Sequence, residues 1–303
     1  GLGDVYKRQA LGCQLAAPVT EALGGDLRHA VFSFIPNTAE VAFIGMCEGL
    51  ESELDHRRTE AILSAQKRDE LTPAVLEEIM SDKLRVEKVA IKDIKLRTFI
   101  AEGATRADLA THVYDVTYGL IEPGVDSLVV IDDCIVRGTT LRQSILRMLD
   151  RLSPRQIVVV SSSPQVRYPD CYGIDMSRMG EFCAFRAAVA LLKESGRTHV
   201  LDDVYHRCLE QESMSDTEIK NCVKDIYAPF SDEEISAQIA RMLTPDGTRA
   251  EVKIIYQTLD GLHQAVPSSP GDWYFSGDYP TPGGTRLVNR AFVNYYEGHP
   301  DRR

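Results

Sequence analysis

The alternation of apolar and polar positions along the chain predicts an α/β protein. Residues 30–35, 128–131 and 157–160 are short apolar runs, and the last two are continuous, which is typical of strands buried on both faces of a parallel sheet. Apolar residues recur at helical spacing between Leu141 and Leu152, after which Ser153-Pro154 ends the pattern. Strand, helix and strand in this order form a βαβ unit, whose first loop lies at the carboxyl edge of the sheet.

Capping residues predict further helices on both sides of this unit. A helical pattern follows the first strand through Val41, Ile44 and Leu50. Three more helix starts are expected at Thr72-Pro73, at Ser215 with Glu218, and at Ser231 with Glu234. Residues 267–284 are rich in Pro, Gly and Ser but carry too many aromatic residues for a free linker, so we expect them to pack on the core.

Composition and charge exclude several classes of protein. The 303 residues are 44% hydrophobic and carry a net charge of −11, with no basic run to follow a nucleic-acid backbone. No apolar run approaches the roughly 20 residues that span a bilayer, so no membrane anchor is expected. Seven cysteines without a CxxC pair fit a reduced, cytoplasmic setting. Residues 1–9 resemble a broken or non-native end and are left out of the fold prediction.

The loop after the second predicted strand carries the candidate chemistry. Gly138 allows a ligand to approach the backbone closely, and Thr139 and Thr140 open a helix whose amides and partial positive charge suit a phosphate. Asp132 and Asp133 are adjacent carboxylates that would repel each other unless they meet hydroxyl donors or a divalent ion. A ribose phosphate with Mg²⁺ satisfies all of these groups. The plainer alternative is a solvated turn followed by a helix cap.

These residues resemble the phosphoribosyl pyrophosphate (PRPP) signature of the type I phosphoribosyltransferases, in the form found in glutamine PRPP amidotransferases. Further segments resemble the same family in the same order along the chain: Ile35-Pro-Asn-Thr38, Arg97-Thr-Phe-Ile100, Tyr168-Pro169 with Tyr172-Gly-Ile-Asp175, and Phe275-Ser-Gly-Asp-Tyr-Pro-Thr281. The matches run over most of residues 10–285 and leave out residues 192–229.

The resemblance implies a type I phosphoribosyltransferase fold, with a mostly parallel twisted sheet flanked by helices and a helical insertion. It implies that ammonia displaces pyrophosphate from PRPP to give 5-phosphoribosylamine in purine synthesis, in a homo-oligomer that uses Mg²⁺. By position, Asp132 and Asp133 would hold the ribose hydroxyls and the metal, and residues 137–140 (Arg137, Gly138, Thr139 and Thr140) the 5-phosphate. Lys92 would contact pyrophosphate and Arg97 would lie at the root of a closing loop, which makes these two the catalytic candidates.

The chain departs from the family pattern at several positions. The first cysteine is Cys13, so the amino-terminal glutaminase domain with its nucleophilic cysteine is expected to be missing upstream. Asp93-Ile94 stand where the family has Asn-Arg, which places an anion beside pyrophosphate. Ala39 replaces a serine that would offer an oxygen to the metal. These changes keep open an alternative function, a PRPP- or nucleotide-binding regulatory module with impaired catalysis. A purine-salvage transferase is a third reading.

The remaining residues predict no further metal chemistry. Gly271 and Tyr274 occupy positions where some family members have cluster cysteines, so no iron–sulfur cluster is expected. The histidines show no metal-ligand spacing, and Cys134 in the signature loop is expected to pack rather than react. The predicted division of the chain is a non-native end at 1–9, a phosphoribosyltransferase core at 10–191, a helical insertion at 192–229, and a segment packed on the core at 230–303.

Overall fold

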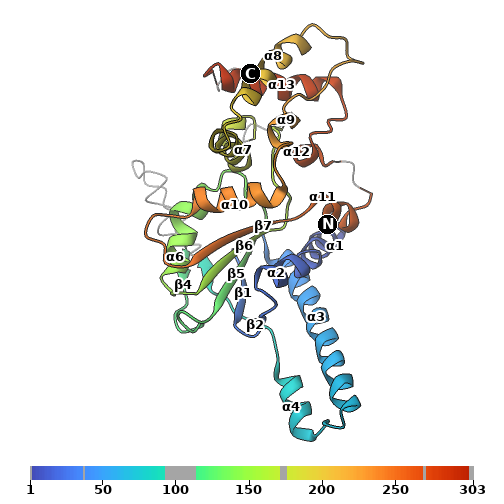
Figure 1. The fold of residues 1–303 in the computed structure, drawn as a ribbon, viewed down its shortest axis with the longest axis vertical. Helices are drawn as coiled ribbons and strands as arrows, with labels where there is room; N and C mark the ends of the chain where they lie inside the picture. The colour runs from blue at the N-terminus through green and yellow to red at the C-terminus, as the bar shows by residue number, and fades with distance from the viewer. Residues whose placement is uncertain (1, 37, 93–113, 171–175, 269–270, 300–303) are drawn as a thin grey trace.

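The structure, a computed structural model, describes residues 2–36, 38–92, 114–170, 176–268 and 271–299. At its centre lies a five-stranded parallel sheet in the order β2-β1-β5-β6-β7 (Figure 1). The strands are β1 (Ala30–Phe34), β2 (Arg85–Val86), β5 (Ser127–Asp132), β6 (Gln156–Ser161) and β7 (Glu251–Tyr256). The three strands expected from the apolar runs are therefore confirmed, and so is the α/β class.

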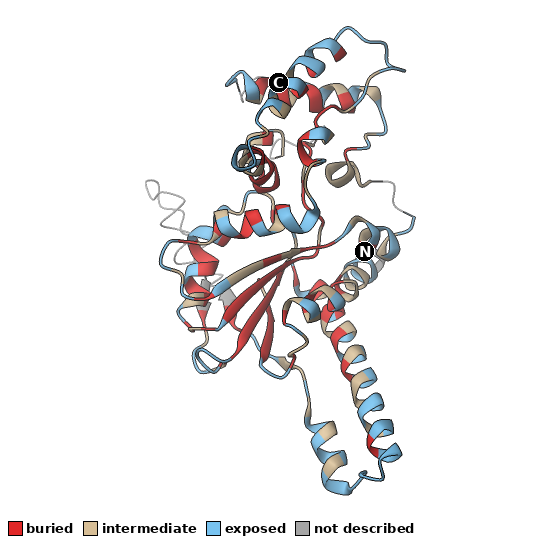
Figure 2. Cartoon of the chain, viewed as in Figure 1, coloured by how far each residue is buried: buried red, intermediate tan, exposed pale blue. Residues whose placement is uncertain are grey.

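Helices cover both faces of this sheet. Strand side chains alternate between two separate apolar clusters, one with Leu128 and Val130 and the other with Val129 and Ile131. Because each central strand is buried on both faces, its sequence is continuously apolar, as Figure 2 shows by its colour. On one face packs α10 (Asp232–Leu243), with α7 (Cys183–Glu194) against α10, and on the other face pack α2 (Ala16–Ala22) and the start of α3 (Glu40–Lys67).

The remaining elements extend outward from the sheet (Figure 1). The far half of α3 projects away from the body and is followed by α4 (Pro73–Ser81), which has no buried residue. A group of helices beyond α7 contains α8 (His199–Gln211), α9 (Lys224–Tyr227) and α13 (Pro282–Tyr296), and short helices α11 (Leu259–Ala265) and α12 (Trp273–Ser276) lie between it and the sheet. The antiparallel pair β3 (Ala90–Lys92) and β4 (Tyr114–Val116) stands apart from the main sheet.

Two of the three predicted helix caps are confirmed. Thr72 accepts the amide of Val75 at the start of α4, and Ser231 with Glu234 forms a complete capping box on α10. The third was wrong, because no helix begins at Ser215. Its hydroxyl bonds the carboxylate of Glu218 at 2.6 Å instead of the amide of that residue, and the segment forms a turn. The helix expected over 141–152 is also modified: a π-helical turn, Leu141–Ile145, precedes α6 (Leu146–Asp150).

Helix α1 (Leu2–Cys13) packs along α3, although its first residues had been left out of the fold prediction. Gly12 faces the backbone of Ala42, and Gly45 faces the backbone of Gln9. A Cβ atom added at either glycine would lie 1.9 Å from the facing carbonyl oxygen. The two helices therefore approach closely because glycine is present on both.

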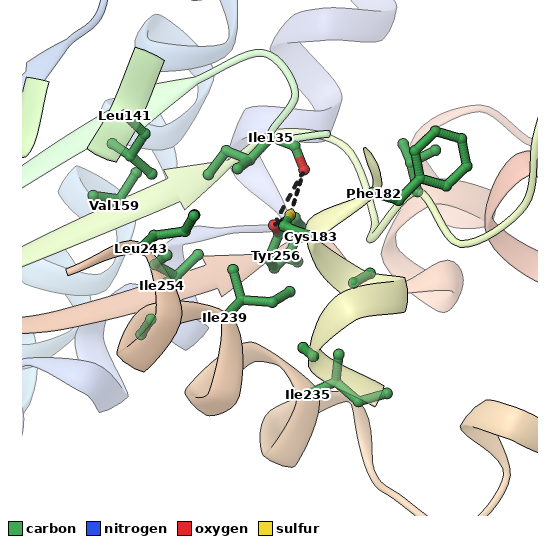
Figure 3. Close-up of a cluster of buried hydrophobic side chains, with 14 of the residues drawn as sticks. Ile135, Leu141, Val159, Phe182, Cys183, Ile235, Ile239, Leu243, Ile254 and Tyr256 are labelled. Carbon is green, nitrogen blue, oxygen red and sulfur yellow. Dashed lines mark hydrogen bonds between the residues drawn. The ribbon is translucent and has the colours of Figure 1, made fainter. Parts of the chain in front are cut away.

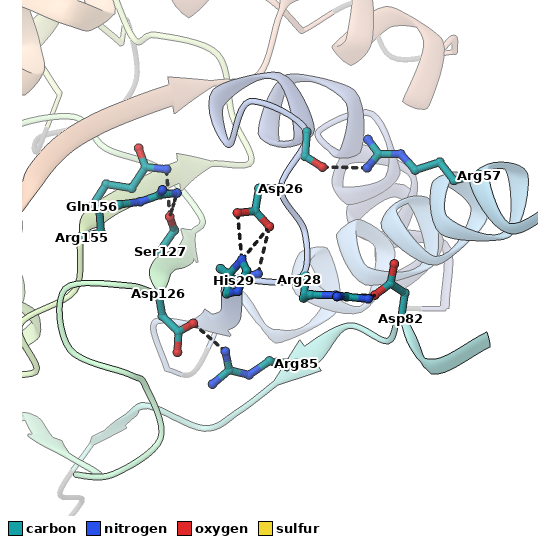
Figure 4. A network of polar contacts seen from close by, with 11 residues as sticks. Asp26, Arg28, His29, Arg57, Asp82, Arg85, Asp126, Ser127, Arg155 and Gln156 are labelled. Atoms are coloured by element: carbon teal, nitrogen blue, oxygen red, sulfur yellow. Dashed lines mark hydrogen bonds and ion pairs between the residues drawn. The ribbon is translucent and has the colours of Figure 1, made fainter. Parts of the chain in front are cut away.

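An ion pair fixes the amino-terminal edge of the sheet (Figure 4). Arg85 donates to the carboxylate of Asp126 at 2.7 Å, and the amide of Glu122 donates to the same carboxylate at 2.6 Å. Burial alone would raise the pKa of Asp126, but these two hydrogen bonds outweigh burial and lower it. Asp126 thus stays charged in the fold and ties the turn before β5 to β2.

Candidate functional site

The strand order defines where a ligand can bind. From β1 the chain crosses to β2 on one side of the sheet, whereas from β5 it continues through β6 and β7 on the other. In open parallel sheets, ligands bind at the carboxyl ends of the strands at such a switch point. The amide of Ile35 donates to the carbonyl of Ile131 at 2.9 Å, so the ends of β1 and β5 lie side by side. The candidate site is therefore the edge formed by residues 35, 36 and 38 and by residues 132–140.

Asp132 and Asp133 stand at this switch point, as predicted. Asp132 is the last residue of β5, and its Oδ1 accepts the amide of Asp133 at 2.9 Å. Both side chains are partly exposed, which leaves carboxylate oxygens within reach of solvent and ligand. Among the residues that the structure describes, no group of three or more His, Cys, Asp or Glu residues could hold a metal ion. The two carboxylates of Asp132 and Asp133 fit Mg²⁺, which binds proteins through one or two carboxylates and takes its remaining ligands from water and phosphate.

Three serines at the end of β6 and just after it, Ser161, Ser162 and Ser163, also line this edge and were not recognised from the sequence. The amides of Ser162 and Ser163 donate to the carbonyls of Asp132 and Asp133 at 2.9 and 3.2 Å. The hydroxyl of Ser162 donates to the Asp133 carbonyl at 3.0 Å, and that of Ser161 to the carbonyl of Ser163 at 2.9 Å. The signal was present, since Ser161-Ser162-Ser163-Pro164 directly follows a buried strand. These bonds hold the two aspartates at the strand end.

Hydrogen bonds from β7 and α7 hold the backbone of the loop between β5 and the following helix (Figure 3). The carbonyl of Ile135 accepts the hydroxyl of Tyr256 at 3.2 Å and the thiol of Cys183 at 3.5 Å. The amide of Cys183 donates to the carbonyl of Val136 at 2.8 Å. Burial raises the pKa of both Tyr256 and Cys183, so both groups remain protonated donors at neutral pH. We call residues 134–140 the phosphate loop.

Gly138 gives the phosphate loop its shape. Its φ of +71° lies in the left-handed region, and an added Cβ would lie 2.4 Å from Cδ1 of Leu243, a buried residue of α10. Thr139 and Thr140 follow in the first helical turn with exposed side chains, and the amide of Arg142 donates to the Gly138 carbonyl at 2.9 Å. The loop therefore has the two features of a phosphate site that the sequence predicted, a close backbone approach and hydroxyls at a helix start.

Arg137 forms an ion pair that the sequence did not reveal. Its Nε lies 2.7 Å from Oε2 of Glu181, in the turn before α7. The two residues are far apart in the sequence, and no local pattern links them. The side chain of Arg137 is 44% exposed and thus remains accessible to a ligand.

The structure describes the other predicted site residues only in part. Lys92 ends β3 opposite Tyr114, and its side chain lies outside the described residues, as does the whole of Arg97. Asp93 and Ile94 belong to the same undescribed segment. Ala39 is fully buried and offers no side-chain oxygen, whereas Thr38 beside it is exposed.

Cys134 lies in the phosphate loop but is not activated as a nucleophile. Loss of hydration around the sulfur, with a further contribution from Asp132, raises the pKa of the thiol to about 11. The thiolate is the reactive form, so the raised pKa disfavours this thiol as a nucleophile, although Cys134 is exposed and does not pack as the sequence predicted.

Two further segments with the family resemblance meet through their described parts, at Tyr168-Pro169 and at residues 275–281, whereas Tyr172–Asp175 lies outside the described residues. The amides of Arg167 and Tyr168 donate to the carbonyl of Tyr274 at 2.9 and 3.1 Å, and the hydroxyl of Tyr279 donates to the carbonyl of Pro169. Tyr274 and Tyr279 are partly buried against the main apolar cluster. The aromatic tail is packed, as its composition predicted.

A hollow of about 410 Å³ lies at the opposite edge of the sheet, between the loop before β1, α3 and α4. Its arginines already have protein partners: Arg28 pairs with Asp82 at 2.7 Å, Arg57 donates to the carbonyl of Gly25 at 2.7 Å, and Arg58 donates to the carbonyl of Asp82 (Figure 4 shows the first two). We therefore place the functional site at the phosphate loop and not in this hollow.

Comparison with known proteins gives short but specific similarity. No family model matches the chain. The amidophosphoribosyltransferases of Pasteurella multocida and Haemophilus influenzae are each 41% identical to it over 59 residues, which is 20% of this chain and 12% of theirs. That of Pyrococcus horikoshii is 39% identical over 70 residues, 23% of this chain and 15% of its own.

Two solved structures align along most of the chain. The glutamine PRPP amidotransferase from B. subtilis, complexed with ADP and GMP, aligns with a TM-score of 0.48 and 20% identity, covering 91% of this chain and 42% of its own. A structure described as the allosteric regulatory enzyme of purine biosynthesis aligns with a TM-score of 0.49 and 21% identity, covering 95% of this chain and 44% of its own. The chain thus spans less than half the length of either protein.

The fold and the site define an α/β protein with a loop suited to phosphate at the switch point of its sheet. Its similarity in sequence is to the amidophosphoribosyltransferases, which are transferases. No described helix is long and apolar enough to cross a membrane.

Proposed function

We propose that the chain is a phosphoribosyltransferase domain of the amidophosphoribosyltransferase type, acting in the cytoplasm in purine synthesis. Ammonia displaces pyrophosphate from C1 of PRPP and gives 5-phosphoribosylamine. In a full-length enzyme the ammonia comes from glutamine through a glutaminase domain, and the whole assembles as a homo-oligomer. The observation that carries this proposal is the phosphate loop with Asp132 and Asp133 at the switch point between β1 and β5.

Each group of residues in the site binds a different part of PRPP. Asp132 and Asp133 accept hydrogen bonds from the ribose hydroxyls, and their charge stabilises the cationic sugar that forms as pyrophosphate leaves. Residues 137–140 hold the 5-phosphate, which fixes C1 in line between ammonia and the leaving group. Lys92 and Arg97 neutralise the pyrophosphate. Asp132 and Asp133 would also hold Mg²⁺, which would supply further charge neutralisation to the leaving group.

One observation favours a second candidate, a regulatory module that binds PRPP or a nucleotide without turnover. Ala39 is fully buried where the family resemblance places a serine oxygen for the metal. A site with fewer metal ligands retains the phosphate contacts but holds the leaving group less firmly. The two candidates share the same ligand and differ in turnover.

Equilibrium titration with PRPP and Mg²⁺ tests the feature common to both candidates. We expect a dissociation constant between about 1 µM and 1 mM, the range in which enzymes usually hold their substrates. Chelation of Mg²⁺ should weaken binding, because the pyrophosphate charge is then not neutralised. A folded chain that does not bind PRPP in this titration would contradict both candidates.

Replacing Gly138 by alanine is expected to weaken binding of ribose 5-phosphate by about tenfold or more. The substitution costs about 1–2 kcal/mol in backbone strain at φ +71° and also forces the loop away from Leu243. The matched control is Gly247→Ala, because Gly247 has a φ of +81° but no atom within 4 Å of an added Cβ. The control should lose stability in urea denaturation and keep its affinity. If Gly138→Ala binds ribose 5-phosphate with wild-type affinity, the phosphate does not bind at this loop.

A further inference from the structure

Three consecutive carbonyl groups of the phosphate loop are bound by groups outside it. The carbonyl of Ile135 accepts Tyr256 and Cys183, and that of Val136 accepts the amide of Cys183. The carbonyl of Arg137 accepts Nη2 of Arg186, one turn along α7, at 2.8 Å. A carbonyl oxygen repels an anion and an amide attracts it. With these oxygens engaged by α7 and β7, the loop is organised to present donors to a phosphate.

The same segment also fixes the side chain of Arg137. Glu181 bridges two guanidinium groups, with Oε2 at 2.7 Å from Nε of Arg137 and Oε1 at 3.3 Å from Nη1 of Arg178. Arg186 lies nearby through its bond to the Arg137 carbonyl, so three arginines and one carboxylate gather beside the loop. The local charge therefore stays positive with Glu181 present, on a chain whose net charge is −11. The carboxylate holds the cations in place without cancelling their attraction for a phosphate.

We propose that Glu181 and Arg186 are positioning residues, which set the affinity of the phosphate loop for the 5-phosphate end of its ligand. This inference rests on the proposed function. Glu181 holds the guanidinium of Arg137 at Nε, so a phosphate meets an arginine that is already oriented. Arg186 holds the backbone of the same residue through its carbonyl. Both act through Arg137 and not on the reacting atoms.

Glu181→Gln tests the role of the bridging carboxylate. The variant keeps the length of the side chain and removes the charge, so it loosens Arg137 and should weaken ribose 5-phosphate binding by about tenfold, the usual worth of a charge-assisted hydrogen bond. Binding of inorganic pyrophosphate with Mg²⁺ should not change, since pyrophosphate is held elsewhere in the site. Arg186→Met, which removes the bond to the Arg137 carbonyl, should weaken ribose 5-phosphate by about threefold and likewise spare pyrophosphate.

Glu194→Gln is the matched control. Glu194 ends the same helix and lies 3.6 Å from Arg241 on the surface, far along α7 from the loop. It should bind both ligands like the wild type.

The outcomes separate this inference from the proposed function. A wild-type chain that binds neither ribose 5-phosphate nor pyrophosphate would overturn the proposed function and this inference with it. If the wild type binds both, unchanged ribose 5-phosphate affinity in Glu181→Gln would overturn the inference alone. Equal losses for both ligands would also overturn it, because they would show a general structural role.

Discussion

Ammonia-dependent turnover should fall at least a hundredfold when Asp132 and Asp133 are both replaced by asparagine. A carboxylate about 5 Å from a developing positive charge contributes about 3 kcal/mol at an effective dielectric constant of about 20. Asparagine keeps the shape of the side chain but loses this charge. The loss acts on the cationic transition state more than on bound PRPP, so kcat should fall more than KM rises.

A control and a stability measurement complete this experiment. Asp246 is exposed in the turn between α10 and β7, and Asp246→Asn should turn over like the wild type. The double variant should unfold near the wild-type urea midpoint, since its backbone bonds to the serines after β6 remain. Unchanged kcat in the folded double variant would show that these aspartates do not contribute to the reaction.

Gly45→Ala is expected to destabilise the protein by about 3 kcal/mol, the upper part of the usual range for overpacking. The added Cβ would lie 1.9 Å from the carbonyl oxygen of Gln9, which belongs to a helix backbone and cannot turn aside. Helix α1 must therefore shift or detach from α3. Urea denaturation measures the loss, and hydrogen exchange of the α1 amides shows whether this helix is released.

Ser52→Ala is the matched control for this substitution, since Ser52 is exposed on the same helix, and it should change stability by less than about 0.5 kcal/mol. Gly49→Ala should cost less than Gly45→Ala, because the nearest atoms to its added Cβ, Cβ of Ala16 and the carbonyl oxygen of Cys13, are 2.7 and 3.0 Å away. Wild-type stability in Gly45→Ala would show that α1 does not pack on α3. The result bears directly on residues 1–9, which no pattern in the sequence had assigned to the fold.

The central strands could be predicted because their burial on both faces requires a continuous run of apolar residues. β5 and β6 are buried on both faces and are continuously apolar, whereas β7 at the sheet edge alternates charged and apolar residues and escaped notice. The helix starts at Thr72 and Ser231 followed local capping rules. At Ser215 the same rule failed: the hydroxyl donates to the Glu218 carboxylate, and the Glu218 amide donates to the backbone carbonyl of Ser215, so a turn forms there.

The candidate site divides in the same way. Asp132, Asp133 and Gly138 follow one strand in the sequence, so their roles could be predicted together. The partners that hold the loop are distant in sequence: Glu181, Cys183 and Tyr256 meet it only because α7 and β7 fold back against β5. The spacing of residues along the sequence does not predict such contacts. Lys92 and Arg97, the catalytic candidates, stay predictions.

The most direct test of the account is pyrophosphate release from PRPP by the purified chain, with Mg²⁺ at mildly alkaline pH, with and without ammonium. We predict release that requires both ammonium and Mg²⁺ and that disappears in the Asp132→Asn, Asp133→Asn variant. Ammonia-dependent release would identify a working transferase domain. A folded chain that binds PRPP and releases no pyrophosphate would contradict the transferase function and leave the regulatory module as the function of this site.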